Sequence, residues 1–110
     1  MQLSELEIDI LGDMQFDAHE LWEWYSFIRS HHPDMAEDEV IKLGYSMFKK
    51  WVARGWLVFY ISRKFTTKID PVEFIKTIEK MGKDAGNPQH PSIVLELSEK
   101  AYKENEWIKK

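Results

Sequence analysis

The spacing of hydrophobic residues changes at Gly55, and this change constrains the fold more than any other feature of the chain. Before Gly55, the apolar side chains from Val40 to Trp51 recur with the period of an amphipathic helix. After it, the segment Trp56–Arg63 alternates between two faces and is rich in β-branched and aromatic residues, as a strand is. A basic last turn followed by glycine is typical of a helix end, so we expect a long helix that ends at Arg54-Gly55 and leads directly into a strand. The chain is therefore expected to belong to the α+β class.

Helix start signals predict three further helices. A capping box places Glu three residues after a Ser or Asp that caps the helix. This pattern occurs at Ser4–Glu7, Asp17–Glu20, Asp34–Glu37 and Asp70–Glu73. We expect the first helix to end near Gly12, the second to end near Pro33, and the fourth to cover residues 70–81, with proline in its first turn.

The last third of the chain predicts a second strand. Turn-forming residues from Gly82 to Pro91 indicate a loop, residues 92–97 have strand composition, and Ser98 is placed to cap a last helix. We expect residues 56–63 and 92–97 to pair antiparallel, with helix 70–81 inserted between them. The predicted core consists of Leu6, Ile10, Leu21, Trp24, Ile28, Val40, Leu43, Met47, Trp51, Leu57, Phe59 and Leu95.

Two stretches are similar to a known superfamily. They are Trp51-Val52-Ala53-Arg54-Gly55-Trp56, where a helix meets a strand, and Val94 to Tyr102, where a strand meets a helix. Together with the element order, they resemble the third helix and the wing strands of winged helix-turn-helix domains. The resemblance implies one winged helix-like domain over residues 1–110, with three N-terminal helices, a two-stranded antiparallel sheet and a C-terminal helix. The chain departs from the pattern at residues 64–91, where it inserts a helix in place of a short wing turn.

The composition predicts a soluble, cytoplasmic protein of one domain. The 110 residues are 44% hydrophobic and 31% charged, which is typical of a globular chain. There is no cysteine, so disulfides, thiolate metal sites and cysteine nucleophiles are excluded. Glu5, Glu7 and Asp9 occupy positions where a secretory signal would carry basic residues, and no apolar stretch approaches the length of a membrane span.

Charge is distributed very unevenly along the chain. The first 40 residues contain eleven acidic residues and one basic residue, Arg29, whereas the remaining 70 contain eight acidic and fourteen basic residues. This polarity predicts two electrostatically opposite faces, which select binding partners rather than determine the fold.

The acidic half favours a non-enzymatic protein-binding module of the immunity, inhibitor or adaptor kind. Complementary charge would steer a basic protein, or the basic half of a second copy, while an aromatic anchor supplies affinity. Trp22 is a candidate anchor because it lies off the apolar stripe of its helix, although packing against the inserted helix would explain it equally well. The candidate protein-binding residues are Glu20, Trp22, Glu23, Asp34, Glu37, Asp38 and Glu39.

The basic middle of the chain supports an alternative function, DNA binding by a transcriptional regulator. The winged helix resemblance implies that the third helix enters the major groove. The candidate DNA-binding residues are Lys42, Tyr45, Ser46, Lys49, Lys50, Arg63 and Lys64. An ordinary solvated helix face explains the same lysines, and the carboxylates of Asp34–Glu39 would repel phosphate at the end of the helix that reads the bases.

No motif points to catalysis, a metal or a cofactor. His19 and Glu23 have the spacing of two ligands on one helix face, and His31, His32 and His90 could contribute, but a zinc site needs at least a third ligand. Adjacent surface histidines near a helix end are ordinary. We therefore expect no enzyme activity, no metal and no cofactor, and a protein or nucleic acid as the partner.

Overall fold

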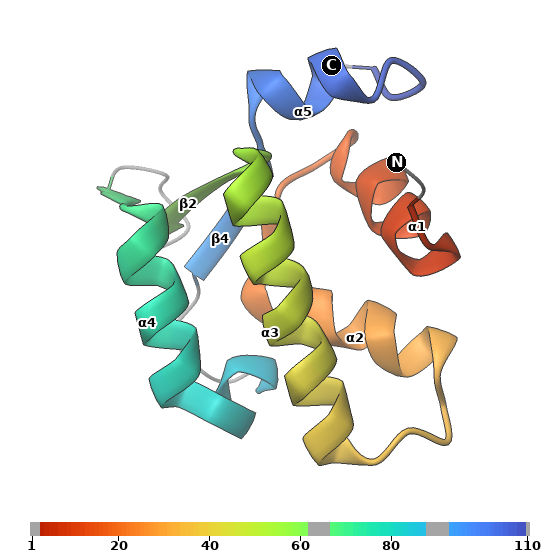
Figure 1. Cartoon of the computed structure of the whole chain (residues 1–110), viewed down its shortest axis with the longest axis vertical. Coiled ribbons are helices and arrows are strands. Elements are labelled where there is room, and N and C mark those ends of the chain that lie inside the picture. The colour runs from red at the N-terminus through yellow and green to blue at the C-terminus, as the bar shows by residue number, and fades with distance from the viewer. Residues whose placement is uncertain (1–2, 62–66, 88–92, 110) are drawn as a thin grey trace.

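The computed structural model describes residues 3–61, 67–87 and 93–109, which form an α+β fold (Figure 1). The elements follow one another as α1 (Glu5–Met14), β1 (His19–Glu20), α2 (Leu21–His31), α3 (Glu37–Arg54), β2 (Leu57–Ile61), β3 (Thr67–Ile69), α4 (Pro71–Met81), a 3-10 helix η1 (Gly82–Gly86), β4 (Ile93–Leu97) and α5 (Glu99–Glu104). Helix α3 crosses the centre of the molecule, with α4 on one side and α1 and α2 on the other.

The sheet is antiparallel, and β4 and β2 form its centre. Phe59 pairs with Leu95, which confirms the predicted pairing of these two strands. The expectation of only two strands was wrong, because the described part of the sheet has four in the order β1-β4-β2-β3. The extra strands contain two and three residues, and such short segments show no recognisable alternation in sequence.

Aromatic rings join the helices to the sheet. Trp24 stacks on Phe48 at a centroid distance of 4.1 Å, and Phe48 meets Phe74 of α4 edge-on at 5.0 Å. Phe74 in turn stacks on Phe59 of β2 at 3.7 Å. The inserted helix α4 is thus part of the core, and rings in these geometries add stabilisation beyond their buried area. The predicted core residues are buried except Leu43, which is half-buried against the core.

The structure confirms one predicted capping box in full and the capping residue of a second. Ser4 and Glu7 form the reciprocal hydrogen bonds of a capping box, and Asp70 accepts hydrogen bonds from the backbone of the first turn of α4. Gly55 has φ of 73°, the left-handed conformation that ends α3 as predicted.

Two predicted helix starts and one predicted end were wrong. Helix α2 begins only at Leu21, because β1 is held in the sheet by pairing with β4, and α3 begins at Glu37 after Ala36, without a side-chain cap. Helix α1 continues past Gly12 to Met14, because its last turns remain packed in the core.

Helices α2 and α3 approach each other closely at Gly44. A Cβ at this position would lie 2.4 Å from Cε1 of Tyr25, and the Gly44 carbonyl accepts a hydrogen bond from Nε1 of Trp24 at 3.1 Å. Glycine is therefore required here by space and not by backbone conformation.

The Gly44→Ala substitution is expected to lower the free energy of unfolding by about 1–3 kcal/mol, because the new methyl group displaces the buried Tyr25 ring. Gly12→Ala is the matched control, since its Cβ would lie 3.8 Å from Trp107, an ordinary contact. The control should stabilise α1 by about 0.5–1 kcal/mol. Urea unfolding followed by tryptophan fluorescence measures both, and equal effects of the two variants would contradict the packing described for α2 and α3.

Candidate functional site

The predicted acidic residues lie in two separate patches. The first patch consists of Glu20, Trp22 and Glu23 at the start of α2. Trp22 is half-buried, and its Nε1 donates a hydrogen bond to Glu20 at 2.6 Å. Partial burial raises the pKa of the Glu23 carboxyl; nearby His19 opposes this rise and the Glu20 carboxylate adds to it.

The second patch consists of Asp34, Glu37, Asp38 and Glu39 at the start of α3, and all four side chains are exposed. Arg29 donates hydrogen bonds to Glu37 through Nε and Nη2, which lowers the pKa of Glu37, and Lys83 pairs with Asp38 at 3.2 Å. The eight residues of α2 that follow Glu23, about 12 Å of helix, lie between the two patches. They therefore do not form one continuous binding site.

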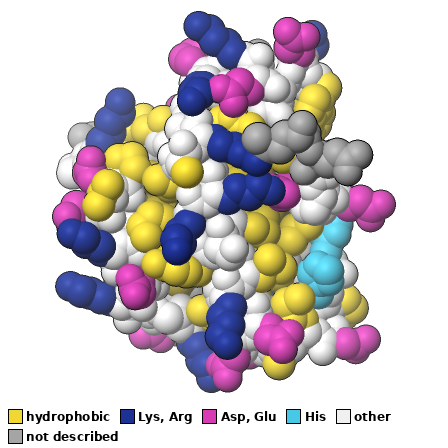
Figure 2. Space-filling model, in the orientation of Figure 1, with side chains coloured by type: hydrophobic (Ala, Val, Ile, Leu, Met, Phe, Trp, Pro, Cys, Tyr) yellow, Lys and Arg dark blue, Asp and Glu magenta, His cyan; other side chains and the backbone are white. Residues whose placement is uncertain are grey.

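Three of the candidate DNA-binding residues, Lys42, Ser46 and Lys49, are exposed on α3. Figure 2 shows Lys and Arg side chains down the middle of the face on which α3 lies, with acidic side chains around them. Tyr45 is half-buried, and its hydroxyl donates a hydrogen bond to Glu79 of α4 at 3.4 Å. Arg63 and Lys64 lie outside the described residues.

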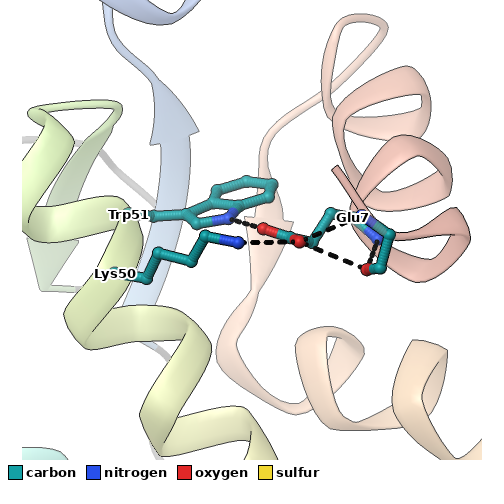
Figure 3. Close-up of polar contacts among 4 residues, drawn as sticks. Glu7, Lys50 and Trp51 are labelled. Carbon is teal, nitrogen blue, oxygen red and sulfur yellow. Dashed lines mark hydrogen bonds and ion pairs between the residues drawn. The ribbon is translucent and has the colours of Figure 1, made fainter. Parts of the chain in front are cut away.

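Lys50 belongs instead to a cluster around Glu7, whose side chain is only 4% exposed (Figure 3). Oε1 of Glu7 accepts hydrogen bonds from Nζ of Lys50 at 3.0 Å and from the backbone N–H of Ser4 at 3.2 Å. Oε2 accepts one from Nε1 of Trp51 at 2.8 Å. Burial alone would raise the pKa of Glu7, but these hydrogen bonds and the charge of Lys50 outweigh it and hold the pKa below its ordinary value.

Acidic and basic halves of the sequence are thus in contact within the described residues. Lys50 reaches Glu7, and Lys83 reaches Asp38. The expectation of two fully separated faces is too simple, because part of the charge is neutralised locally. Each half therefore has fewer unpaired charged residues than the sequence indicated.

Two histidines tie α1 to the elements that follow it. Asp13 and Asp9, one turn apart on α1, meet Nε2 of His19 and Nε2 of His31 at 2.5 and 2.6 Å. Glu23 lies 3.8 Å from the same nitrogen of His19. Within the described ranges, no group of three or more His, Asp and Glu side chains is arranged to hold a metal ion.

Sequence reasoning missed an exposed apolar surface. Ile8, Phe16 and Trp107 are large hydrophobic side chains with exposed fractions of 43%, 83% and 49%. One signal was present in the sequence, because Ile8 lies off the apolar stripe of α1 formed by Leu6 and Ile10. The contacts of Trp107 with α1 follow only from the tertiary structure.

Comparison with protein-family models, with curated proteins and with solved structures gave no match to this chain. Across the described segments, no helix is both long enough and apolar enough to cross a bilayer.

The Glu7→Gln substitution is expected to lower the free energy of unfolding at neutral pH by about 1–3 kcal/mol, because the Trp51 and Lys50 donors lose a charged acceptor. Since the folded-state pKa lies below the ordinary value of 4.5, ionised Glu7 stabilises the fold above that pH. This stabilisation is lost as the pH falls through the folded-state pKa, so the difference between the variant and the original chain should shrink in acid.

Urea unfolding at several pH values measures this difference. Glu5→Gln is the control, because Glu5 is an exposed acid in the same turn of α1. A Glu7→Gln loss no larger than that of Glu5→Gln, or one that does not change with pH, would contradict the role assigned to Glu7.

Proposed function

We propose that this chain is a non-enzymatic protein-binding module of the immunity, inhibitor or adaptor kind, and that its partner presents a basic surface. The observation that carries the proposal is the exposure of all four carboxylates at the start of α3: Asp34, Glu37, Asp38 and Glu39. Exposed carboxylates on a rigid helix end raise the association rate of a cationic partner and select against anionic ones.

The ion pairs already present in this patch do not prevent a partner from binding to it. Arg29–Glu37 and Lys83–Asp38 are exposed pairs, and such pairs contribute only about 0–1 kcal/mol, so a partner's cations can replace them. Among the described residues, no Lys or Arg is paired with Asp34 or Glu39. The patch of Glu20, Trp22 and Glu23 is a second acidic surface, which includes half-buried Trp22.

DNA binding by a winged helix-like domain is the alternative. It is supported by the order of α1, α2, α3, β2 and β4, by the antiparallel pairing of β2 with β4, and by exposed Lys42, Ser46 and Lys49 on α3. Three features weigh against it: Lys50 is bound to Glu7, α4 packs against α3 through Phe74, and carboxylates occupy the first turn of α3. We therefore place it second.

The protein-binding proposal predicts that the triple variant Glu37/Asp38/Glu39→Lys loses its partner. Immobilised protein is used to capture partners from the source cell, and the association rate of the captured partner is then measured at low and high salt. We expect the triple variant to slow association about tenfold or more, because steering depends on these charges. The control is Glu73/Glu79/Asp84→Lys, which makes the same change in net charge at exposed positions on α4 and η1. Capture of no partner, or equal association rates for the two triple variants, would refute the proposal.

The alternative makes its own prediction for Lys42/Lys49→Glu. If α3 contacts a duplex, the original chain should bind mixed-sequence DNA with an affinity that falls linearly in log salt, and the variant should not bind. A gel-shift titration at low salt measures both. Absence of any shift by the original chain would eliminate DNA binding.

A further inference from the structure

An apolar surface forms where the segment after α5 lies against α1. In Figure 1 this segment lies next to α1, and its position is fixed by two contacts. The backbone N–H of Lys109 donates a hydrogen bond to Oε1 of Gln15 at 2.7 Å, and buried Ile108 anchors the segment in the core. The ring of Trp107 then lies near Gly12, where a Cβ would lie 3.8 Å from it.

Two hollows share Ile8 and Trp107 in their linings. One, of about 490 Å³, is also lined by Phe16 and Phe27. The other, of about 630 Å³, is also lined by Leu3 and Trp56. An exposed apolar surface of this kind is typical of a protein interaction site, because a partner that covers it removes apolar side chains from contact with water.

The charged side chains that line the two hollows are all acidic. Asp9 and Asp13 border the first hollow and Glu104 borders the second, and no Lys or Arg among the described residues lines either. Asp9 and Asp13 are paired with His31 and His19 but remain more than half exposed, so each has oxygen atoms open to a partner. Glu104 accepts a hydrogen bond from Nε1 of Trp56 at 3.0 Å and pairs with Lys100 at 3.7 Å, and its side chain stays partly exposed.

We propose that this surface binds a cationic amphipathic helical segment of the partner; the proposal rests on the protein-binding function above. Two apolar side chains one or two turns apart on one helix face would enter the two hollows. Flanking Lys or Arg side chains would meet Asp9, Asp13 and Glu104. The carboxylates exclude an acidic segment, a nucleic acid or an anionic membrane surface, because each would place like charges together.

Helix α3 of a second copy is a poorer occupant of the surface. The exposed basic residues of α3 are Lys42 and Lys49, and between them the exposed position is Ser46, while Tyr45 is half-buried against Glu79. This face therefore offers charge but no apolar side chain that could enter a hollow. A partner segment that combines both features matches the surface better than α3 of a second copy.

The test selects helical peptides from an unbiased display library against the immobilised full chain. Selected peptides are synthesised with a fluorescent label, and their Kd is measured by anisotropy for the original chain and for Phe16→Ser, Trp107→Ala and Val72→Ser. Phe16 is 83% exposed, so its replacement leaves the core intact, and Val72, an exposed apolar residue on α4, is the matched control.

We expect the selected peptides to combine Lys or Arg with two apolar anchors and to bind about tenfold more weakly to Phe16→Ser and Trp107→Ala. Their affinity for Val72→Ser should be unchanged. Peptides that retain their affinity for both surface variants would overturn the inference. Light scattering that shows a dimer of the original chain and a monomer of Phe16→Ser would also overturn it, because the occupant would then be a second copy.

Binding to the Glu37/Asp38/Glu39→Lys variant separates the two proposals. Peptides that bind this variant poorly but bind Phe16→Ser with unchanged affinity would support protein binding at the start of α3. The same result would refute the inference about the apolar surface. Failure to select any peptide, together with capture of no partner, would remove both.

Discussion

A buried carboxylate, Glu7, is the interaction on which the arrangement of this fold depends. An ionised side chain that is 4% exposed is costly unless its oxygen atoms are fully hydrogen-bonded. Lys50, Trp51 and Ser4 supply that hydrogen bonding, and the first two belong to α3 (Figure 3). Helix α1 is therefore fixed against α3 in position and in rotation. A purely apolar contact would have left its rotation less well defined.

The rotation of α1 about its axis determines which part of the protein each of its other faces contacts. Leu6 and Ile10 enter the core, and Asp9 and Asp13 face the histidines of β1 and α2. The remaining face, around Ile8 and Gly12, meets the segment after α5 and forms the two hollows. The candidate binding surface is thus a consequence of the same contact that places α1. The uneven distribution of charge along the sequence is a weaker guide to function, because some of the charged side chains are paired with one another inside the chain.

The sequence predicted those elements whose signals are local and long enough to be recognised. The eighteen residues of α3 with Gly55 at their end, the start of α4 at Asp70-Pro71, and the pairing of β2 with β4 were all readable. Strand β1 was not, because two residues are held as a strand only by β4. Likewise Glu7 was readable as a capping residue, but its burial depends on Trp51, 44 residues away. The acidic candidate residues form two patches and not one, because part of α2 lies between them. The length of this helix was not taken into account when the site was predicted from the sequence.

The central claim is that Glu7 is ionised while buried and joins α1 to α3. An NMR titration that follows the side-chain carboxyl carbon of Glu7 in the folded protein tests it most directly. The account predicts a pKa below the ordinary value of 4.5, with chemical shifts of the Trp51 indole N–H that change at the same pH. A pKa at or above 4.5, or an indole N–H that is indifferent to the titration, would show that the hydrogen bonds do not outweigh burial and would contradict the account.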